Sequence, residues 1–278
     1  MKIDLYAVCH NEQDMLPFFL RHYERFVDRM FIYDNQSDDH SPILLKSHPK
    51  VVYHCCSTGG LFREDWITNL KNEAWKKHSM NSDYVFVVDI DEFIYHPHLA
   101  TLLKQYHAGG IECIHAYGYN MVADTFPSVE SGRQIYDDIH FGVPESSFDK
   151  VSVFDPRKID IQYYPGAHCC KGIMNARYPR RRVIKLLHYK FVDFHRLAAR
   201  CASRQSRNSE INKAMNWGTY HYTEDEIRRQ FQQIKEKAIN VMIHRPPPYQ
   251  NTLRGRIADF AFYYLRGGRR RWIAANTP

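Results

Sequence analysis

The stretch "DYVFVVDIDEFIY", residues 83–95, joins an apolar run to a cluster of acids. Residues 84–88 are all β-branched or aromatic, which is typical of a buried β-strand. Asp89, Asp91 and Glu92 follow directly. Clustered carboxylates repel one another and resist burial, so a buried strand that ends in them requires compensating positive charge. The stretch therefore predicts a site at the end of a strand, and it raises the question of what supplies that charge.

The sequence around this stretch alternates strand-like and helix-like segments. Short apolar runs predict strands over 3–9, 30–33, 50–56 and 84–93, and apolar residues at helical spacing predict helices over 14–27 and 63–78. This alternation predicts an α/β fold with a mainly parallel central sheet flanked by helices. In such sheets, ligands bind beyond the carboxyl ends of the strands.

Polar side chains follow three of these strands. They are Asn11 and Glu12 after the first strand, Asp34 and Asn35 after the second, and Asp89 and Asp91 after the fourth. Because the carboxyl ends of parallel strands meet at one edge, we expect these groups to face a common site. The loop over 34–39 also has a second interpretation. Its Asp and Asn side chains either accept hydrogen bonds from a base or ribose, or form Asx-turns that hold the loop.

Further candidate residues come from a helix and from two histidines. The helix predicted over 63–78 presents Asn69 and Asn72 on one face beside its apolar stripe, either as the lining of a cleft or as a solvent-facing edge. His168 in "YYPGAHCC" and His188 in "KLLHYK" follow apolar segments. A histidine in such a place is a metal ligand, a general base or a structural side chain.

The pattern changes beyond residue 110 and suggests how the chain is organised. We expect one main domain over 1–222, with halves over 1–110 and 111–222; the resemblance described below implies that the first half binds a nucleotide and that the second faces the acceptor. A helical C-terminal extension is expected over 223–278. In the second half, the sequence predicts a loop over 136–150 and a strand followed by a helix over 183–205. It also predicts a helix over 223–242 that begins with a capping box formed by Thr223 and Glu226.

Composition bounds the class of protein. The chain has 278 residues, of which 44% are hydrophobic and 25% charged, as expected for one large globular domain. Its seven cysteines include no CxxC spacing, which argues against a zinc site. The N-terminus lacks a secretory signal, and no apolar run is long enough to span a bilayer. We expect a cytoplasmic protein with free thiols.

The net charge of +7 is concentrated in three basic segments, 177–185, 196–207 and 266–272. Such segments are either solvated surface or binding sites for an anionic partner such as a nucleotide diphosphate, an anionic membrane or a nucleic acid. The last segment follows an apolar, aromatic helical face that begins at residue 255. It predicts either a terminal helix packed on the domain or peripheral attachment to the inner face of the cell membrane.

The acid cluster itself points to a divalent cation. Mg²⁺ and Mn²⁺ prefer carboxylate oxygens and accept water and phosphate in their remaining positions. A bound cation would offset the repulsion between Asp89 and Asp91 and would hold a diphosphate leaving group. The alternative is that the acids cap the strand or form surface salt bridges.

Taken together, these residues resemble a known family. The segments "AVCHNEQDMLPFFLRHYERF", "FIYDNQSDDHS", "WITNLKNEAW" and "DYVFVVDIDEF" are similar to the family 2-like glycosyltransferases of bacteria with the GT-A (Rossmann-like) fold, and "DIDEF" stands in the place of their DxD motif. The resemblance implies a nucleotide-sugar donor, with a UDP-sugar expected, and Mn²⁺ or Mg²⁺ as cofactor. It also implies inverting transfer to the hydroxyl of a saccharide or lipid-linked acceptor in the assembly of cell-surface polysaccharide, lipopolysaccharide or glycolipid.

The resemblance also implies roles for individual residues. Donor binding would involve Asn11, Glu12, Asp34, Asn35 and Asp89, together with Asn69 and Asn72 from the helix. The metal would be held by Asp89, Asp91 and His188, with His168 as second choice. The acidic pair that often supplies the base in these enzymes is not evident beyond "DIDEF", and the candidates for the base are Asp124, Glu145 and Asp149.

Two other classes of function share some of these features with a glycosyltransferase. A metal-dependent nuclease or phosphohydrolase also uses clustered acids, but its acidic motif usually lies on an early strand of an antiparallel sheet. A non-enzymatic protein that binds nucleic acid or membrane through its arginines would leave the strand-end acids unexplained. We therefore expect an enzyme without a nucleic-acid partner.

Overall fold

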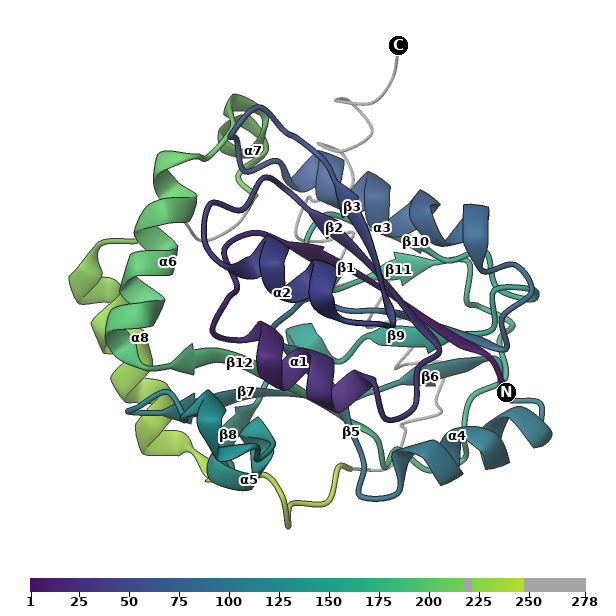
Figure 1. Cartoon of the computed structure of the whole chain (residues 1–278). Helices are drawn as coiled ribbons and strands as arrows, with labels where there is room; N and C mark the ends of the chain where they lie inside the picture. Colours follow the sequence, from purple (N-terminus) through teal and green to yellow (C-terminus); the bar gives the residue numbers. More distant parts are fainter. Residues whose placement is uncertain (218–221, 248–278) are drawn as a thin grey trace.

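The computed structural model describes residues 1–217 and 222–247 and places two β-sheets at the centre of the protein, with helices around them (Figure 1). The predicted α/β class with a mainly parallel central sheet flanked by helices is confirmed. The C-terminal segment expected to lie at a membrane falls outside the described residues. Within the described ranges, none of the helices has the length and apolar character needed to cross a bilayer.

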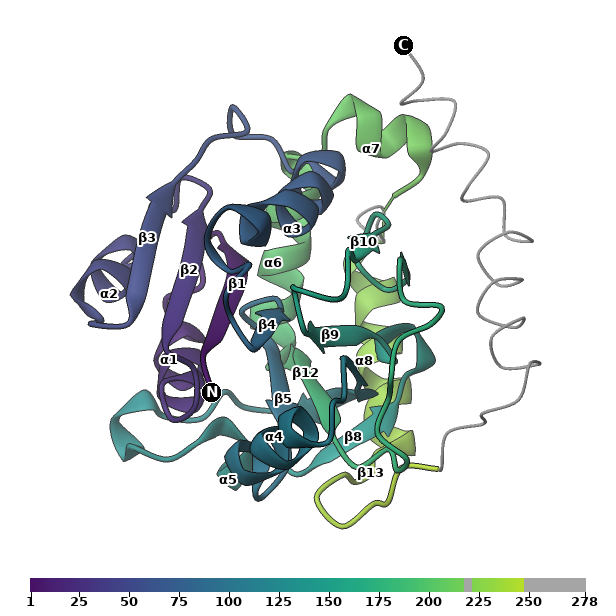
Figure 2. The ribbon, with the colours of Figure 1, turned by 90° about the vertical axis from the view of Figure 1, so that its right-hand side faces the viewer.

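The first sheet has six strands in the order β3-β2-β1-β4-β9-β6. Its parallel part consists of β1 (Ile3–Cys9), β2 (Arg29–Asp34), β3 (Val51–Cys55) and β4 (Tyr84–Val87), and its antiparallel edge of β9 (Val151–Phe154) and β6 (Cys113–His115). Figure 2 shows β3, β2 and β1 side by side, with β5, β8 and β12 lower in the view. Because the parallel strands run the same way, their carboxyl ends share one edge.

The side chains of this sheet alternate between two cores. Ile3, Leu5 and Ala7 of β1 face α1 (Leu16–Tyr23) and α2 (Ser41–Ser47). Tyr6 and its neighbours on β2 and β4 face Trp75 of α3 (Glu64–His78) instead. Helices therefore cover both faces, and this period-two alternation of apolar residues is what a buried parallel strand requires.

The second sheet has five strands in the order β13-β8-β7-β12-β5. They are β5 (Glu92–Tyr95), β7 (Tyr117–Ala123), β8 (Phe141–Pro144), β12 (Lys185–Val192) and β13 (Ile239–Asn240). The other elements are α4 (Leu99–Ala108), α5 (Ile135–Asp138), α6 (Phe194–Ser206), α7 (Glu210–Met215), α8 (Glu224–Lys237), the hairpin of β10 (Gln162–Tyr163) and β11 (Cys170–Lys171), and 3-10 turns at Val129–Ser131 and Ser146–Phe148.

The strand predicted over 84–93 is wrong as a single element. β4 ends at Val87, a turn closed by the Glu92 N–H to Asp89 carbonyl hydrogen bond of 3.0 Å follows, and β5 then joins the other sheet. Asp89 and Asp91 therefore lie where the chain passes from one sheet to the other. The turn frees both side chains from strict strand alternation, so both can face one side.

Two further expectations about secondary structure need correction. The loop predicted over 136–150 contains β8, which pairs with β7 and β13. Gly142 of β8 lies so close to β7 that a Cβ there would come 2.6 Å from the Asn120 carbonyl oxygen, a packing constraint that hydrophobic patterning does not reveal. The helix predicted to residue 242 ends at Lys237, because the following residues form β13, although its predicted Thr223–Glu226 capping box is present.

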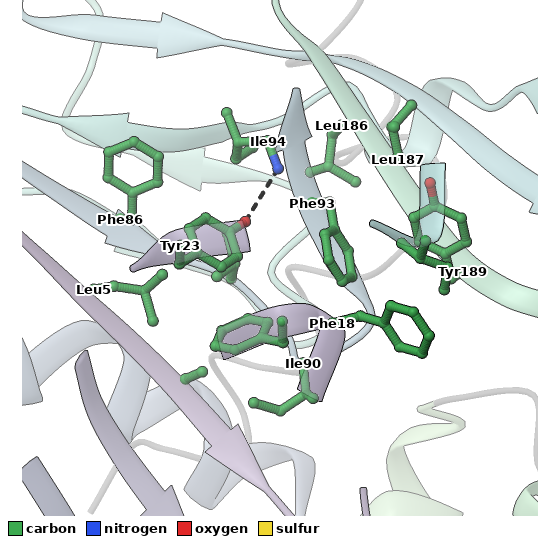
Figure 3. Close-up of a cluster of buried hydrophobic side chains, with 14 of the residues drawn as sticks. Leu5, Phe18, Tyr23, Phe86, Ile90, Phe93, Ile94, Leu186, Leu187 and Tyr189 are labelled. Carbon is green, nitrogen blue, oxygen red and sulfur yellow. Dashed lines mark hydrogen bonds between the residues drawn. The ribbon is translucent and has the colours of Figure 1, made fainter. Parts of the chain in front are cut away.

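A buried tyrosine joins α1 to the second sheet (Figure 3). The Tyr23 hydroxyl donates to the Glu92 carbonyl oxygen at 2.8 Å and accepts from the Ile94 N–H at 3.1 Å, and its ring packs against Phe93. Both partners of the hydroxyl are backbone groups of β5. Tyr23 thus holds the segment that follows the acid cluster.

We expect Tyr23→Phe to lower the free energy of unfolding by about 1–3 kcal/mol, because it leaves a buried carbonyl and a buried N–H without their partner. Urea denaturation of both proteins measures the change. Tyr106→Phe is the matched control, since Tyr106 is half-buried without a hydroxyl hydrogen bond among the described residues. Equal losses for the two variants would contradict the role given to the Tyr23 hydroxyl.

A second prediction concerns His22, which is buried beside Tyr23 and donates from Nε2 to the Ile94 carbonyl oxygen at 3.0 Å. Burial lowers the pKa of His22 from 6.5 to about 3. The folded state therefore binds fewer protons than the unfolded state, and stability should be lost as the pH falls from about 6.5 toward 3.

Chemical denaturation at pH 7.5 and pH 4.5 tests this. The His22→Gln variant should lose less stability between these pH values than the parent protein, by about 1–2 kcal/mol. His98→Gln, at an exposed position, should leave the pH dependence unchanged. An unchanged pH dependence in His22→Gln would contradict the assignment.

Candidate functional site

A cavity of about 930 Å³ opens at the carboxyl ends of the parallel strands. The predicted residues Asn11, Glu12, Asn35, Asp89 and Asp91 all line it. On the opposite side it is bounded by α6 and α8, which lie beside the end of β12 (Figure 1). The three strand ends that carry polar residues therefore open into one space large enough for a nucleotide.

Each acid of the cluster has its own protein cation. Lys71 of α3 contacts Asp89 at 2.7 Å, Arg200 of α6 contacts Asp91 at 2.8 Å, and Lys150 contacts Glu92 at 2.7 Å. Each of the three carboxylates therefore has a different cationic partner. The positive charge that the sequence called for is thus provided, in this structure, by side chains from three separate elements.

The neighbouring cations lower the pKa values of Asp89 and Asp91. Burial works against ionisation of Asp89, but Lys71 and Lys150 outweigh it and lower its pKa from 3.8 to about 2. Burial likewise opposes ionisation of Asp91, and the guanidinium of Arg200 with the imidazole of His188 holds its pKa well below the usual value. Both groups are therefore carboxylates at neutral pH, the form that binds a cation.

Glu92 stabilises the turn that carries Asp89 through buried contacts. It is fully buried, its Oε1 bonds Lys150, and its Oε2 accepts the Asp89 N–H at 3.1 Å. Both carboxylate oxygens are used within the protein. Glu92 therefore fixes the turn that carries Asp89 and does not line the cavity.

His188 and Asp91 form a donor pair that fits a divalent cation. His188 Nδ1 lies 2.8 Å from Asn120 Oδ1, an acceptor, so Nδ1 donates to it. Nε2 lies 3.4 Å from Asp91 Oδ2. Because that carboxylate oxygen can only accept, either a proton on Nε2 or a metal ion has to lie between the two atoms. A histidine fixed through Nδ1 is the usual arrangement of a metal ligand.

The rest of a metal coordination sphere would come from elsewhere. Across residues 1–217 and 222–247, no group of three or more His, Cys, Asp or Glu side chains is placed to hold a metal ion. Asp89, the third predicted ligand, contacts Lys71. Mg²⁺ is usually held by one or two carboxylates together with water and substrate phosphates, so a two-residue donor set fits such an ion when a diphosphate is bound.

His168, the second-choice ligand, also lines the cavity but has a different setting. Its Nδ1 donates to the Ser147 carbonyl oxygen at 2.8 Å, and its ring packs edge-on against Phe148. Burial and the nearby Lys150 ammonium lower the pKa of His168 to about 3. It is therefore a neutral imidazole at physiological pH. Phe148 separates it from His188, whose ring stacks on the same phenyl group at 4.1 Å.

The polar residues after β1 and β2 hold the rim loops together. Asn11 Nδ2 donates to Asp38 Oδ1 at 2.6 Å, and the Asp38 N–H donates to Asn11 Oδ1. Asn35 is bonded in both directions to Thr58. Asp34 accepts from Ser37 and from the Tyr53 hydroxyl and does not line the cavity. The Asx-turn interpretation therefore describes Asp34, whereas Asn11 and Asn35 both brace the loops and face the cavity.

The helix α3 turns a different face to the cavity from the one predicted. Asn69 is exposed and lies outside the lining, and Asn72 bonds the Tyr163 backbone of β10 in both directions. Glu64, Ile67 and Lys71 line the cavity instead. Their spacing of three and four residues marks one face of a helix, but only the tertiary structure decides which face meets the strand ends.

Of the three candidate bases, the structure brings one to the cavity. Asp124 is paired with Lys235 and lines a separate cavity of about 420 Å³, and Asp149 is bonded to Arg182 and to the Gly118 N–H. Glu145 lines the main cavity. The sequence-based nomination missed Glu64, which also lines it.

Glu64 and Glu145 are the carboxylates of the cavity that have no ion pair among the described residues. Glu64 Oε1 accepts the Gly166 N–H at 2.7 Å, and burial raises the pKa of Glu64. Glu145 Oε1 accepts from the backbone and hydroxyl of Ser147. In both cases the second carboxylate oxygen has no hydrogen-bond partner within residues 1–217 and 222–247, and it remains able to accept a proton.

The basic segment 196–207, for which an anionic partner was one of two interpretations, forms a face of α6 that lines the cavity. Arg196, Arg200 and Arg204 recur every fourth residue and line the cavity, and Arg200 contacts both Glu12 at 2.7 Å and Asp91. The signal was present in "RLAARCASR", where i, i+4 spacing places the arginines on one helical face. That spacing could not show which residues the arginines contact, because Arg200 contacts Asp91, which lies 109 residues earlier in the chain.

Comparison with known proteins gives only partial structural likenesses. No protein-family model matches the chain, and no curated protein matches its sequence. Among solved structures, S. aureus TarS has a TM-score of 0.34 at 15% identity, covering 46% of this chain and 23% of that one.

Two further solved structures are similar to a comparable degree. Glucosyl-3-phosphoglycerate synthase from Mycobacterium tuberculosis, in complex with phosphoglyceric acid, has a TM-score of 0.31 at 16% identity, covering 42% of this chain and 44% of that one. A 4-diphosphocytidyl-2C-methyl-D-erythritol synthase has a TM-score of 0.34 at 18% identity, covering 57% and 76%. The chain thus spans less than a quarter of TarS, and its function has to be argued from the residues of the cavity.

The buried Lys150–Glu92 pair gives a direct test of charge compensation in the site. Lys150→Met should lower the free energy of unfolding by about 3–5 kcal/mol, because it leaves a buried carboxylate without its cation. Adding Glu92→Gln should recover most of that loss, since glutamine keeps an acceptor for the Asp89 N–H and carries no charge. Urea denaturation of the single and double variants measures both effects.

Lys213→Met, which breaks the exposed Lys213–Glu210 pair, is the matched control and should change nothing measurable. If the double variant is as unstable as the sum of its single variants, the ion pair is not the reason for the loss.

Proposed function

We propose that this protein is a cation-dependent glycosyltransferase that moves a sugar from a nucleotide-sugar donor, with a UDP-sugar expected, to an acceptor hydroxyl. The observation that carries the proposal is the donor pair Asp91–His188 in the cavity where three parallel strands end. A carboxylate beside an imidazole lone pair, in a cavity of about 930 Å³ with basic side chains opposite, suits a cation bound to a nucleoside diphosphate. The resemblance of the motifs to family 2-like glycosyltransferases points the same way.

The residues of the cavity have distinct roles in this proposal. Asn11 and Asn35 offer amide groups to the nucleoside at the rim. Asp91 and His188 would hold Mn²⁺ or Mg²⁺, which when bound would neutralise the diphosphate of the donor. Asp89, kept ionised by Lys71, lies beside them to accept from the ribose or to complete the coordination.

The basic side chains of the cavity would bind the phosphates of the donor. Arg200 contacts Glu12 and Asp91 through one nitrogen each, and its guanidinium can exchange these carboxylates for a phosphate, to which it can donate two parallel hydrogen bonds. The charge that leaves with the nucleotide is thus met by preorganised cations. Glu64 or Glu145, which both line the cavity, would accept the proton of the acceptor hydroxyl in a single inverting displacement.

The biological setting is proposed from sequence alone. The expected acceptor is a saccharide or lipid-linked glycan of the cell surface, and the basic, aromatic segment over 255–278 would bring the enzyme to an anionic membrane.

Calorimetric titration with UDP, GDP and CDP, each with and without Mn²⁺, tests the proposal. We expect at least one of them, UDP first, to bind with a sub-millimolar Kd when Mn²⁺ is present and at least about tenfold more weakly after the cation is removed with EDTA. Asp91→Asn should abolish the effect of Mn²⁺.

Asp160→Asn, an exposed carboxylate outside the cavity, is the matched control and should bind as the parent protein does. If none of the three nucleoside diphosphates binds at millimolar concentration, the proposed function is wrong. Binding that is equally tight in EDTA would overturn the role of the cation.

A further inference from the structure

The side of the cavity away from the strand ends has its own chemistry. Lys190 from the end of β12, Trp217 after α7, Tyr222 before α8, and Gln230 and Gln233 of α8 line it, and we call these five residues the outer face. Figure 1 shows α6 between α8 and the carboxyl end of the first sheet. None of these five residues was predicted as part of a site, and none takes part in the donor site described above.

Lys190 brings an uncompensated charge to this face. Among the described residues its ammonium forms no ion pair, and Nζ lies over the Phe191 ring, 5.3 Å from the ring centre. Burial, together with the like charges of Arg204 and Arg200, lowers the pKa of Lys190, and the opposing carboxylate of Asp91 is already paired with Arg200. A partly buried cation beside two others favours an anion from outside the protein.

This anion is additional to the donor diphosphate. The cations nearest the strand ends, Lys71 and Arg200, each contact a carboxylate of the donor site. A diphosphate with its divalent cation would change partners among these groups. Lys190 would still have no anionic partner, so an anionic group of a second ligand would stabilise its charged form.

The other side chains of the outer face suit a sugar. Trp217 and Tyr222 offer aromatic surfaces, which pack against the apolar C–H faces of a pyranose while their polar ends stay hydrated. Gln230 and Gln233 lie three residues apart on one face of α8, and neither side chain has a hydrogen-bond partner among the described residues. An amide both donates and accepts, which matches hydroxyl groups.

We propose that the outer face binds the acceptor, and that this acceptor is an acidic saccharide whose carboxylate or phosphate contacts Lys190. The proposal rests on the proposed function, since it assigns the second substrate of the same cavity. Rings of Trp217 and Tyr222 hold the sugar, the two glutamines bind its hydroxyls, and Lys190 selects for the charged group. Carboxylate and phosphate share the same recognition chemistry here, and the experiment separates them.

Saturation-transfer difference NMR on the full chain tests this with D-glucuronate, D-glucose 6-phosphate and uncharged D-glucose as probes. We expect at least one acidic sugar to bind about fivefold or more tightly than glucose, as a charge-assisted contact provides. Lys190→Gln should bring the acidic sugars to the level of glucose. Trp217→Ala should weaken all three probes by a similar factor. Lys237→Gln, an exposed lysine of α8 outside the cavity, is the matched control and should change nothing.

The outcomes separate this proposal from the one on which it rests. Equal binding of glucose and both acidic sugars, or an unchanged preference in Lys190→Gln, overturns it. Inorganic phosphate that displaces glucose 6-phosphate at equal concentration assigns a simple anion site and also overturns it. Titration of the same variants with UDP and Mn²⁺ reports on the donor site alone. Retained nucleotide binding in Lys190→Gln also shows that the variant is folded.

Discussion

A carboxylate taken out of water is stable only beside a compensating charge, and the turn after β4 places three of them within four residues. The structure meets this demand with Lys71, Lys150 and Arg200, which come from α3, from the residue before β9 and from α6. These three contacts join elements of both sheets and the helix that bounds the cavity. Because the acids require these partners, the position of α3 and α6 around the strand ends depends on them.

The same turn explains why the site lies where it does. β4 belongs to the first sheet and β5 to the second, so the acids stand at the junction of the two sheets. β12, the partner of β5, places His188 opposite Glu92 and brings its imidazole to Asp91. A junction of this kind lets residues separated by about 100 positions in the chain meet in a cavity without a long loop. Asp91 contacts Arg200 in this structure, and in the proposed function a metal ion shared with His188 would take the place of that arginine.

Local patterns predicted the elements whose cause is local. β1 begins and ends where its apolar run does, the strand-to-helix change at β12 and α6 is clear in the sequence, and the Thr223–Glu226 capping box is present. The loop predicted over 136–150 was wrong, because β8 is held by pairing with β7 and β13 and has little apolar alternation of its own. Long-range contacts decided the rest of the site. Periodicity could not choose Glu64 and Lys71 over Asn69 and Asn72, and it could not show that Arg200 meets Asp91.

Pulsed electron paramagnetic resonance of Mn²⁺ bound with UDP would show whether His188 holds the metal, because it detects nitrogen nuclei coordinated to the metal. We predict a coupling to one imidazole nitrogen that disappears in His188→Ala and persists in His168→Gln. A bound Mn²⁺–UDP complex without any imidazole coupling, or with a coupling that survives His188→Ala, would contradict it.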